Sequence, residues 1–209
     1  MSGGALTEAL SGVEPPAPPE AREQLAHLFQ MLRAWRGAGI VGFRSAEDLA
    51  LHYFREALLL GRLLPERGPF LDIGSGGGTP ALPLAIAGGG HWLLLEPRQV
   101  SAAFLEMAAD KLGLSPRVRV VRRRLKDFLR DSTGRAELAR VSAVTMRAVR
   151  LQDGEWTLLA AGMSPGAPLI WPTSRAARER AALKSGLFDE EFVPADRGVV
   201  WIGRPRTAS

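Results

Sequence analysis

The amino-acid sequence predicts an α/β fold with a seven-stranded, mostly parallel sheet, and two patterns predict it. Between residues 69 and 171, five short apolar runs alternate with stretches whose apolar residues recur at helical spacing. This alternation is typical of a parallel sheet covered by helices on both faces. The last two apolar runs, at 188–193 and 199–202, are joined by a short Pro/Asp/Arg/Gly segment. Because no crossover helix fits there, they predict a C-terminal antiparallel hairpin at the sheet edge.

Local patterns place the individual elements. Parallel strands are expected at 69–73, 92–95, 118–121, 141–146 and 168–171, with helices at 82–87 and 100–112. Two further helices precede the sheet. The first begins near Glu20 and ends before Gly37. The second begins at Ser45, whose spacing to Asp48 resembles a capping box, and ends before Pro65.

The composition predicts one folded domain with a short tail. Of the 209 residues, 46% are hydrophobic and 23% charged, a balance typical of a globular protein. Residues 1–19 are rich in proline and small side chains, so we expect a disordered Pro-rich tail there. A single domain follows at 20–209, with a helical extension at 20–66 and a Rossmann-like core at 67–209.

Several absences narrow the function classes. No apolar run approaches the roughly 18 to 20 residues that span a bilayer, so we expect a cytoplasmic protein with no membrane partner, and a monomer. The chain has no cysteine, which excludes disulfides, thiolate metal sites and a cysteine nucleophile. The three histidines, His27, His52 and His91, are not spaced as a metal site, and we expect no metal and no catalytic role for them.

A glycine-rich turn follows the first predicted strand. Residues 72–78 read DIGSGGG, with an apolar strand before them and a helix after them, at the end of the strand where such folds bind ligands. A dinucleotide fingerprint would need Gly or Ala at Thr79, and a P-loop would need Gly-Lys-Ser/Thr. Glu96 ends the second strand, where its carboxylate can accept ribose hydroxyls. With the terminal hairpin, these features fit a Rossmann-like class I methyltransferase that binds S-adenosyl-L-methionine through Gly74, Ser75, Gly76, Gly78 and Glu96.

With these residues in view, residues 25–203 resemble the 16S ribosomal RNA guanine-N7 methyltransferases, the glucose-inhibited division protein B family. The resemblance rests on Leu32-x-x-Trp35, on His52, on the run LDIGSGGGTPALPLAI at 71–86, and on Arg124 before Phe128. It implies a cofactor site made by the residues matching the family's own: Gly74, Thr79, Leu125, Lys126 and Arg147.

The chain departs from the family pattern at four places. The family usually has Asn-Leu-Thr at 39–41, Asp-Ser at 55–56, a Lys/Arg pair at 100–101 and an acidic residue at 126. This chain has Gly-Ile-Val, Arg-Glu, Val-Ser and Lys there. These positions belong to the surfaces that the resemblance assigns to the substrate and to the rim of the adenosine site.

Residues that the chain lacks also disfavour two of the possible methylation reactions. Methylation at C5 of a pyrimidine needs a cysteine nucleophile, and methylation of an exocyclic amine commonly uses an Asn/Asp-Pro-Pro-aromatic motif where this chain has Thr145-Met146-Arg147-Ala148. Guanine N7 has an exposed lone pair and needs no deprotonation, so positioning and desolvation suffice. We therefore expect no catalytic acid or base.

The basic residues indicate a polyanionic partner. The net charge is +5, most basic residues are arginines, and the densest cluster, at 117–130, begins with Arg117 and Arg119 on the third strand. We expect Arg119, Arg122 and Arg123 to contact RNA phosphates, with a merely solvated edge strand as the alternative. The leading hypothesis is methylation of N7 of a guanine in small-subunit ribosomal RNA. A small-molecule methyltransferase and a non-catalytic RNA-binding relative are the two alternatives.

Overall fold

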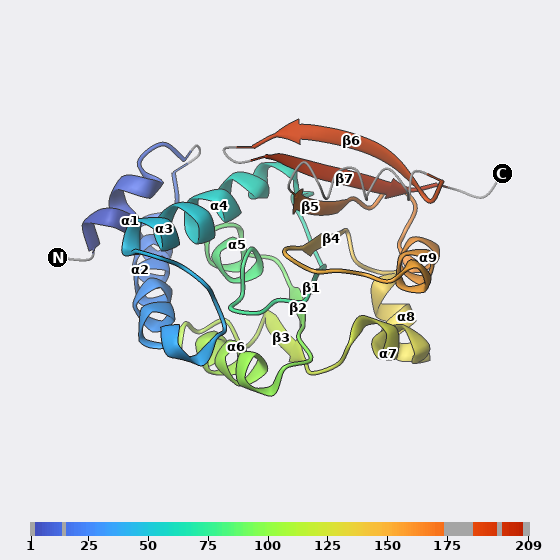
Figure 1. Ribbon diagram of the computed structural model, residues 1–209, viewed down its shortest axis with the longest axis horizontal. Coiled ribbons are helices and arrows are strands. Elements are labelled where there is room, and N and C mark those ends of the chain that lie inside the picture. The colour runs from blue at the N-terminus through green and yellow to red at the C-terminus, as the bar shows by residue number, and fades with distance from the viewer. Residues whose placement is uncertain (1–2, 14–15, 174–185, 196–197, 207–209) are drawn as a thin grey trace.

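The computed structural model describes residues 3–13, 16–173, 186–195 and 198–206, and its centre is one seven-stranded sheet (Figure 1). The strand order is β3-β2-β1-β4-β5-β7-β6. The strands are β1 (Phe70–Ile73), β2 (Trp92–Leu95), β3 (Val118–Val121), β4 (Ala143–Met146), β5 (Leu169–Thr173), β6 (Phe188–Pro194) and β7 (Val199–Pro205).

The pairing of the strands confirms the predicted fold class. Strands β1 to β5 run parallel, whereas β7 pairs antiparallel with both β5 and β6. The order reverses at β1, which lies between β2 and β4. A sheet of this kind binds ligands at the carboxyl ends of its strands beside such a reversal, so the turn after Ile73 is at the expected position.

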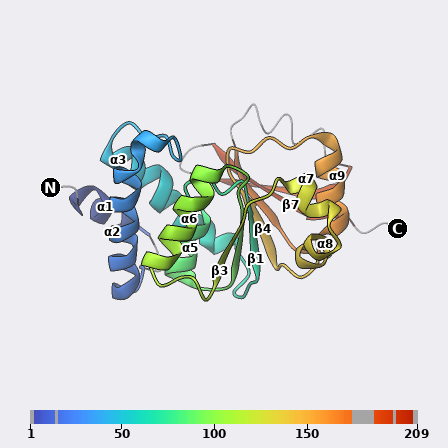
Figure 2. The ribbon, with the colours of Figure 1, turned by 90° about the horizontal axis from the view of Figure 1, so that it is seen from below.

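Helices cover both faces of the sheet (Figure 2). Because side chains alternate along a strand, Phe70 and Trp92 pack on one side and Leu71 and Leu93 on the other. The first side is covered by α5 (Ala81–Gly88) and α6 (Gln99–Lys111), and α2 (Pro19–Ala34) packs against α5 on the outside (Figure 2). The second is covered by α7 (Leu125–Arg130), α8 (Ser132–Leu138) and α9 (Asp153–Gly162).

The N-terminal segment differs from the disordered tail expected at 1–19. Residues Gly3–Leu10 form helix α1, and Leu6, Ala9 and Val13 are buried in the same core as α2. The physical reason is that the prolines lie only at the end of this segment. The residues before them carry apolar side chains at helical spacing, which can cover a neighbouring helix. Residues 1, 2, 14 and 15 of the expected tail lie outside the described residues.

The second predicted helix is divided into several pieces. After η1 (Arg36–Ala38), they are α3 (Ala46–Leu49), a π-helical turn η2 (Ala50–Arg55), α4 (Glu56–Leu60) and η3 (Gly61–Leu63). Ser45 caps α3 by accepting a hydrogen bond of 3.1 Å from the Asp48 amide, as the sequence predicts. In the π-turn the Glu56 amide donates a hydrogen bond to the Leu51 carbonyl, five residues earlier in the chain. Turns of this type often occur at functional sites.

Candidate functional site

The glycine turn has positive φ at three residues, for different reasons. A Cβ on Gly74 would lie 2.5 Å from Val149 Cγ2, and one on Gly78 would lie 2.5 Å from Leu82 Cδ1. Gly76 has φ +55°, yet a Cβ there would meet nothing closer than 3.6 Å. Close packing therefore requires Gly74 and Gly78 to be glycines, whereas at Gly76 the constraint is the backbone conformation.

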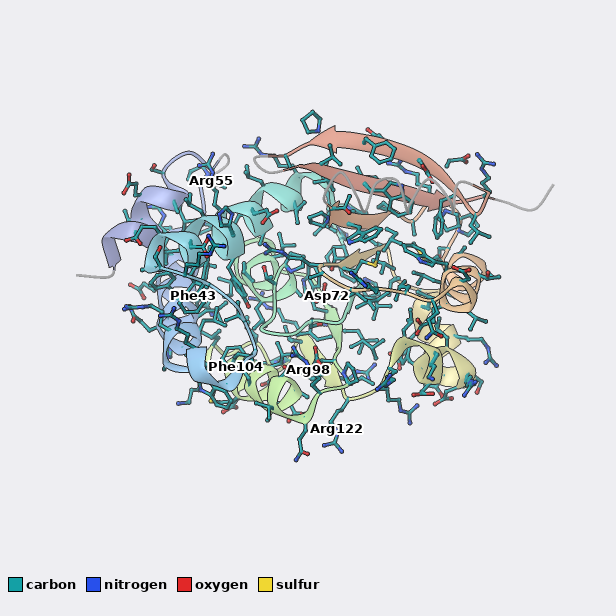
Figure 3. All side chains as sticks on the ribbon, viewed as in Figure 1. Phe43, Arg55, Asp72, Arg98, Phe104 and Arg122 are labelled. Carbon is teal, nitrogen blue, oxygen red and sulfur yellow. The ribbon has the colours of Figure 1, made fainter. Side chains whose placement is uncertain are left out.

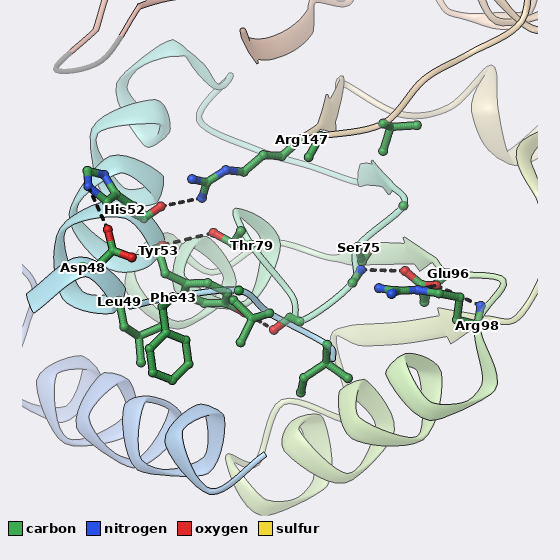
Figure 4. Close-up of a pocket in the computed structure, with 18 of the residues that line it drawn as sticks. Phe43, Asp48, Leu49, His52, Tyr53, Ser75, Thr79, Glu96, Arg98 and Arg147 are labelled. Atoms are coloured by element: carbon green, nitrogen blue, oxygen red, sulfur yellow. Dashed lines mark hydrogen bonds and ion pairs between the residues drawn. The ribbon is translucent and has the colours of Figure 1, made fainter. Parts of the chain in front are cut away.

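A cavity of about 800 Å³ lies at the carboxyl ends of β1, β2 and β4 (Figure 4). This volume is ample for a cofactor. Six of the residues predicted to bind the cofactor line it: Gly74, Ser75, Gly76, Thr79, Glu96 and Arg147. Gly78 does not line it and packs beneath the turn instead.

The predicted pair Leu125 and Lys126 lines a separate cavity of about 230 Å³. The two cavities share Gly74, Pro97 and Val149 as lining residues, so they lie side by side at the end of β1. Only an elongated ligand that passes these shared residues could contact both sets of predicted residues.

Glu96 is buried at the end of β2, and both of its carboxylate oxygens are engaged. Oε2 accepts a hydrogen bond of 2.7 Å from the Gly76 amide, and Oε1 accepts bonds of 2.8 and 3.2 Å from the amide and Nε of Arg98. A carboxylate has about four acceptor positions, so Oε2 retains capacity for a ligand hydroxyl. Glu96 therefore fixes the shape of the turn and can still accept a hydrogen bond from within the cavity.

Arg147, which follows β4, is held by the π-helical segment. Its Nη1 donates to the His52 carbonyl, and its Nη2 lies 2.8 Å from Glu56 Oε2. Both partners in this ion pair are largely buried, with 27% and 16% of their side chains exposed. Glu56 is one of the positions where the chain departs from the family pattern, and the structure shows that it holds Arg147 in place.

Tyr53 connects the π-helical turn to the glycine turn. Its hydroxyl donates to the Gly77 carbonyl, and its own carbonyl accepts a bond of 3.0 Å from the Thr79 hydroxyl. Burial raises the pKa of Tyr53 well above its usual value, although the nearby charge of Arg147 lowers it and that of Asp72 raises it. The phenol therefore stays neutral and remains a donor.

Asp72 lies on β1 directly beneath the turn, and only 1% of it is exposed. Its Oδ1 accepts a 2.6 Å hydrogen bond from the Thr145 hydroxyl, whereas Oδ2 has no partner among the residues that the structure describes. Burial raises the pKa of Asp72 to about 7, against hydrogen bonds from Thr145 and Ser75 and with a smaller contribution from the charge of Glu96. Asp72 can therefore hold a proton near neutral pH (Figure 3 shows its central position).

Sequence reasoning did not assign several residues of the large cavity to the site. These are Ile40, Phe43, Asp48, His52, Tyr53 and Arg98. All but Arg98 come from the segment before the sheet, and the only signals for them were the family resemblance at His52 and the departure from the family pattern at 39–41. The His52 Nε2 and Asp48 Oδ1 atoms lie 3.4 Å apart, one helical turn from each other.

The three arginines predicted to bind RNA are exposed, but two of them are already paired. Arg119 pairs with Glu137, and Arg123 Nη1 lies 2.8 Å from Asp131 Oδ2. Arg122 makes no ion pair within the described part of the chain, and Figure 3 shows it pointing away from the ribbon. Because exposed ion pairs contribute little stability, Arg119 and Arg123 could exchange their partners for phosphates.

The described residues show neither a metal site nor a membrane-spanning helix. They contain no group of three or more His, Cys, Asp or Glu side chains that could hold a metal ion. No helix within the same residues is long and apolar enough to cross a membrane.

The comparison with protein families decides the family. The family model described as rRNA small subunit methyltransferase G, GidB, matches residues 21–160, which is more than half of the chain. This chain belongs to that family. A Ribosomal RNA small subunit methyltransferase G from Mycolicibacterium vanbaalenii is 33% identical over 150 residues, which are 67% of this chain and 63% of that protein. One from Streptomyces avermitilis is 29% identical over 203 residues, 93% of this chain and 78% of that protein.

Solved structures share the fold of this member of the methyltransferase G family. A putative S-adenosyl-L-methionine-dependent methyltransferase from Methanococcus maripaludis has a TM-score of 0.62 at 12% identity and covers 95% of this chain and 99% of its own. A methyltransferase from Geobacter sulfurreducens has a TM-score of 0.58 at 17% identity, with 96% and 97% covered. At such low identity these similarities establish the class I methyltransferase fold alone.

Proposed function

We propose that this chain transfers a methyl group from S-adenosyl-L-methionine to N7 of a guanine in 16S ribosomal RNA, and that it does so in the cytoplasm. The observation that carries the proposal is the large cavity after β1. It is lined by six of the residues expected to bind the cofactor, in a chain of the methyltransferase G family. The relatives named above are ribosomal RNA methyltransferases, which supports the same class of substrate.

The residues present fit this cofactor. Gly76 leaves room for close approach, since a Cβ there would meet nothing within 3.6 Å, and Glu96 Oε2 retains acceptor capacity for a ribose hydroxyl. Arg147 supplies a held cation in the same cavity. The neighbouring cavity beside Leu125 and Lys126 would take the part of the ligand that extends past Pro97.

The reaction then depends on positioning rather than on proton transfer. When bound, the cofactor supplies a methyl group on a positively charged sulfonium, and guanine N7 has a lone pair that needs no base. The Phe43, Leu49 and Tyr53 side chains line the same cavity and can exclude water around an inserted base. Orientation and desolvation of this kind can account for several kcal/mol of rate enhancement.

Methyl transfer from radiolabelled cofactor tests the proposal. We would offer 30S subunits, naked 16S ribosomal RNA and a metabolite pool to the protein, and map the labelled base. Label at N7 of one guanine in ribosomal RNA is the expected result. Label in the metabolite pool alone would establish a small-molecule enzyme, and no label despite cofactor binding would establish a non-catalytic relative. A Gly76→Val protein is the matched control, because it should lose label on every acceptor.

A further inference from the structure

A second large cavity lies at the opposite edge of the sheet from the glycine turn. It has a volume of about 450 Å³ and includes Phe70, Trp92 and Val118, the first residues of β1, β2 and β3. Because these strands are parallel, this is their amino edge, whereas the cofactor cavity lies at their carboxyl edge. A ligand here would therefore not compete with the cofactor.

The floor of this amino-edge cavity is apolar. The Phe70 and Trp92 rings pack with their centroids 4.8 Å apart, and both side chains are almost fully buried. The indole Nε1 of Trp92 already donates to the Gly89 carbonyl at 3.1 Å. These rings are almost inaccessible, so the apolar surface that faces the cavity comes from the exposed residues Pro69 and Pro116, against which a base or a ribose can pack.

The rim of the amino-edge cavity is cationic. Arg117, Arg119 and Arg140 line it together with one acid, Glu137, which pairs with Arg119. Arg117 and Arg140 form no ion pair with any residue for which the structure gives a position. Arg117 Nε is buried and has no hydrogen-bond partner there. A buried donor without a partner is costly, so the guanidinium of Arg117 gains a partner if it turns toward an anionic acceptor in the cavity.

A series of grooves joins the amino-edge cavity to the cofactor cavity. A groove of about 230 Å³ between β3 and α8 shares Arg119 and Glu137 with the amino-edge cavity and contains Arg123. Arg123 also lines the cavity of Leu125 and Lys126, which in turn adjoins the cofactor cavity. β3 is the edge strand of the sheet, so no further strand covers this track.

We propose that the amino-edge cavity binds one nucleotide of the RNA substrate, with its phosphate on Arg117 and Arg140 and its base or ribose against Pro69 and Pro116. The strand then follows the edge of β3 to the methylation cavity. A polymer fits better than a compact ligand because neighbouring cavities share lining residues and Arg117, Arg119 and Arg123 are spaced along the edge strand. The identity of the RNA in this inference rests on the proposed function, whereas the chemistry of the cavity is argued from the residues that line it.

The test compares the Arg117→Gln/Arg140→Gln protein with Arg204→Gln/Arg206→Gln as the control. The control removes the same charge from the distant hairpin, where both arginines pair with acids. Binding of a fluorescent single-stranded RNA is measured by anisotropy across a salt series. We expect about tenfold weaker binding and a salt slope reduced by about 1 to 2 in the first protein, and wild-type values in the control. Arg140→Gln alone, at an exposed position, gives the same direction if the double variant is unstable.

A second arm identifies the source of the nucleotide. Guanosine 5′-monophosphate and guanosine are titrated by calorimetry into wild-type protein and the double variant. If the double variant loses RNA binding and the wild type shows no measurable binding of the mononucleotide, the RNA strand is supported as the ligand. In the alternative outcome, the wild type binds the mononucleotide tightly while the double variant loses that binding and keeps its RNA affinity. This result would overturn the RNA strand as the ligand and indicate a free nucleotide. Equal RNA affinity and slope in all three proteins, without mononucleotide binding, would overturn the site altogether.

Methyl transfer separates this inference from the proposed function. If both hold, the double variant raises KM for ribosomal RNA and leaves kcat and the affinity for S-adenosyl-L-homocysteine unchanged. Methylation with an unchanged KM would overturn the inference while the proposed function stands. RNA binding that depends on Arg117 and Arg140, in a protein that methylates no RNA, would overturn the proposed function and leave the binding site in place.

Discussion

Replacing Asp72 with asparagine tests the protonation state of the buried acid beneath the glycine turn. Burial raises the pKa of Asp72 from 3.8 to about 7, so between these values the folded protein holds a proton that the unfolded chain releases. The stabilisation that this group contributes is therefore fully present below pH 4 and is lost as the pH rises to 7. The difference between the two pKa values corresponds to a loss of at most about 4 kcal/mol in the free energy of unfolding.

Urea unfolding between pH 4.5 and 8 measures this effect as the difference between the Asp72→Asn protein and the wild type. Asparagine can still accept the hydrogen bond from Thr145, and its buried amide adds a cost of about 1 to 3 kcal/mol that does not depend on pH. The wild type should lose stability relative to the variant as pH rises, and the difference should level off above pH 7. Asp110→Asn, at an exposed position on α6, is the control and should follow the wild type. Parallel curves for Asp72→Asn and the wild type would refute the reasoning.

Three further predictions concern the cofactor cavity and the edge strand. Gly76→Val should abolish binding of S-adenosyl-L-homocysteine in calorimetry, because a branched residue is strained at φ +55° and fills the approach to the turn. Glu96→Ala should weaken that binding by about 1 to 3 kcal/mol and also lower the melting temperature, since Gly76 and Arg98 lose their acceptor. Arg122→Gln should reduce the salt slope of RNA binding more than Arg123→Gln, whose parent arginine is paired with an acid in the free protein.

Each of these predictions has an outcome that contradicts it. Wild-type affinity in the Gly76→Val protein would move the cofactor away from the turn. A lower melting temperature with unchanged affinity in Glu96→Ala would make Glu96 purely structural. Equal slopes for the two arginine variants would show that the ion pair of Arg123 does not limit its contact with RNA.

The strands and the cofactor turn could be predicted because local sequence determines them. A buried parallel strand needs a continuous apolar run, and the predicted bounds of β2 and β3 match the structure residue for residue. β5 extends to Thr173 because Thr173 pairs with Val199, and β7 extends to Pro205 because Pro205 pairs with Phe188, in both cases beyond the apolar run. Backbone hydrogen bonds can therefore extend a strand where side-chain patterns give no signal.

The wall of the cavity opposite the turn could not be predicted, because tertiary contacts define it. Tyr53 and His52 lie in a helical stretch whose apolar periodicity predicts an ordinary α-helix, yet their carbonyls accept hydrogen bonds from Thr79 and Arg147. Those partners are far away in the sequence, so the π-helical turn has no local signature. The same holds for Glu56. In the sequence it is only a position that differs from the family pattern, whereas in the structure it forms an ion pair with Arg147.

The basic cluster after β3 shows how far charge alone can indicate function. Counting arginines treats every cation as available, but Arg119 pairs with Glu137 of α8 and Arg123 pairs with Asp131, the N-cap residue of that helix. Arg117 and Arg140 are separated in sequence and were not grouped by counting, yet they line one cavity and carry no ion pair in the described chain. Because phosphate binding depends on cations that are not already neutralised, we expect the RNA contacts of this chain to depend on this pairing more than on arginine density.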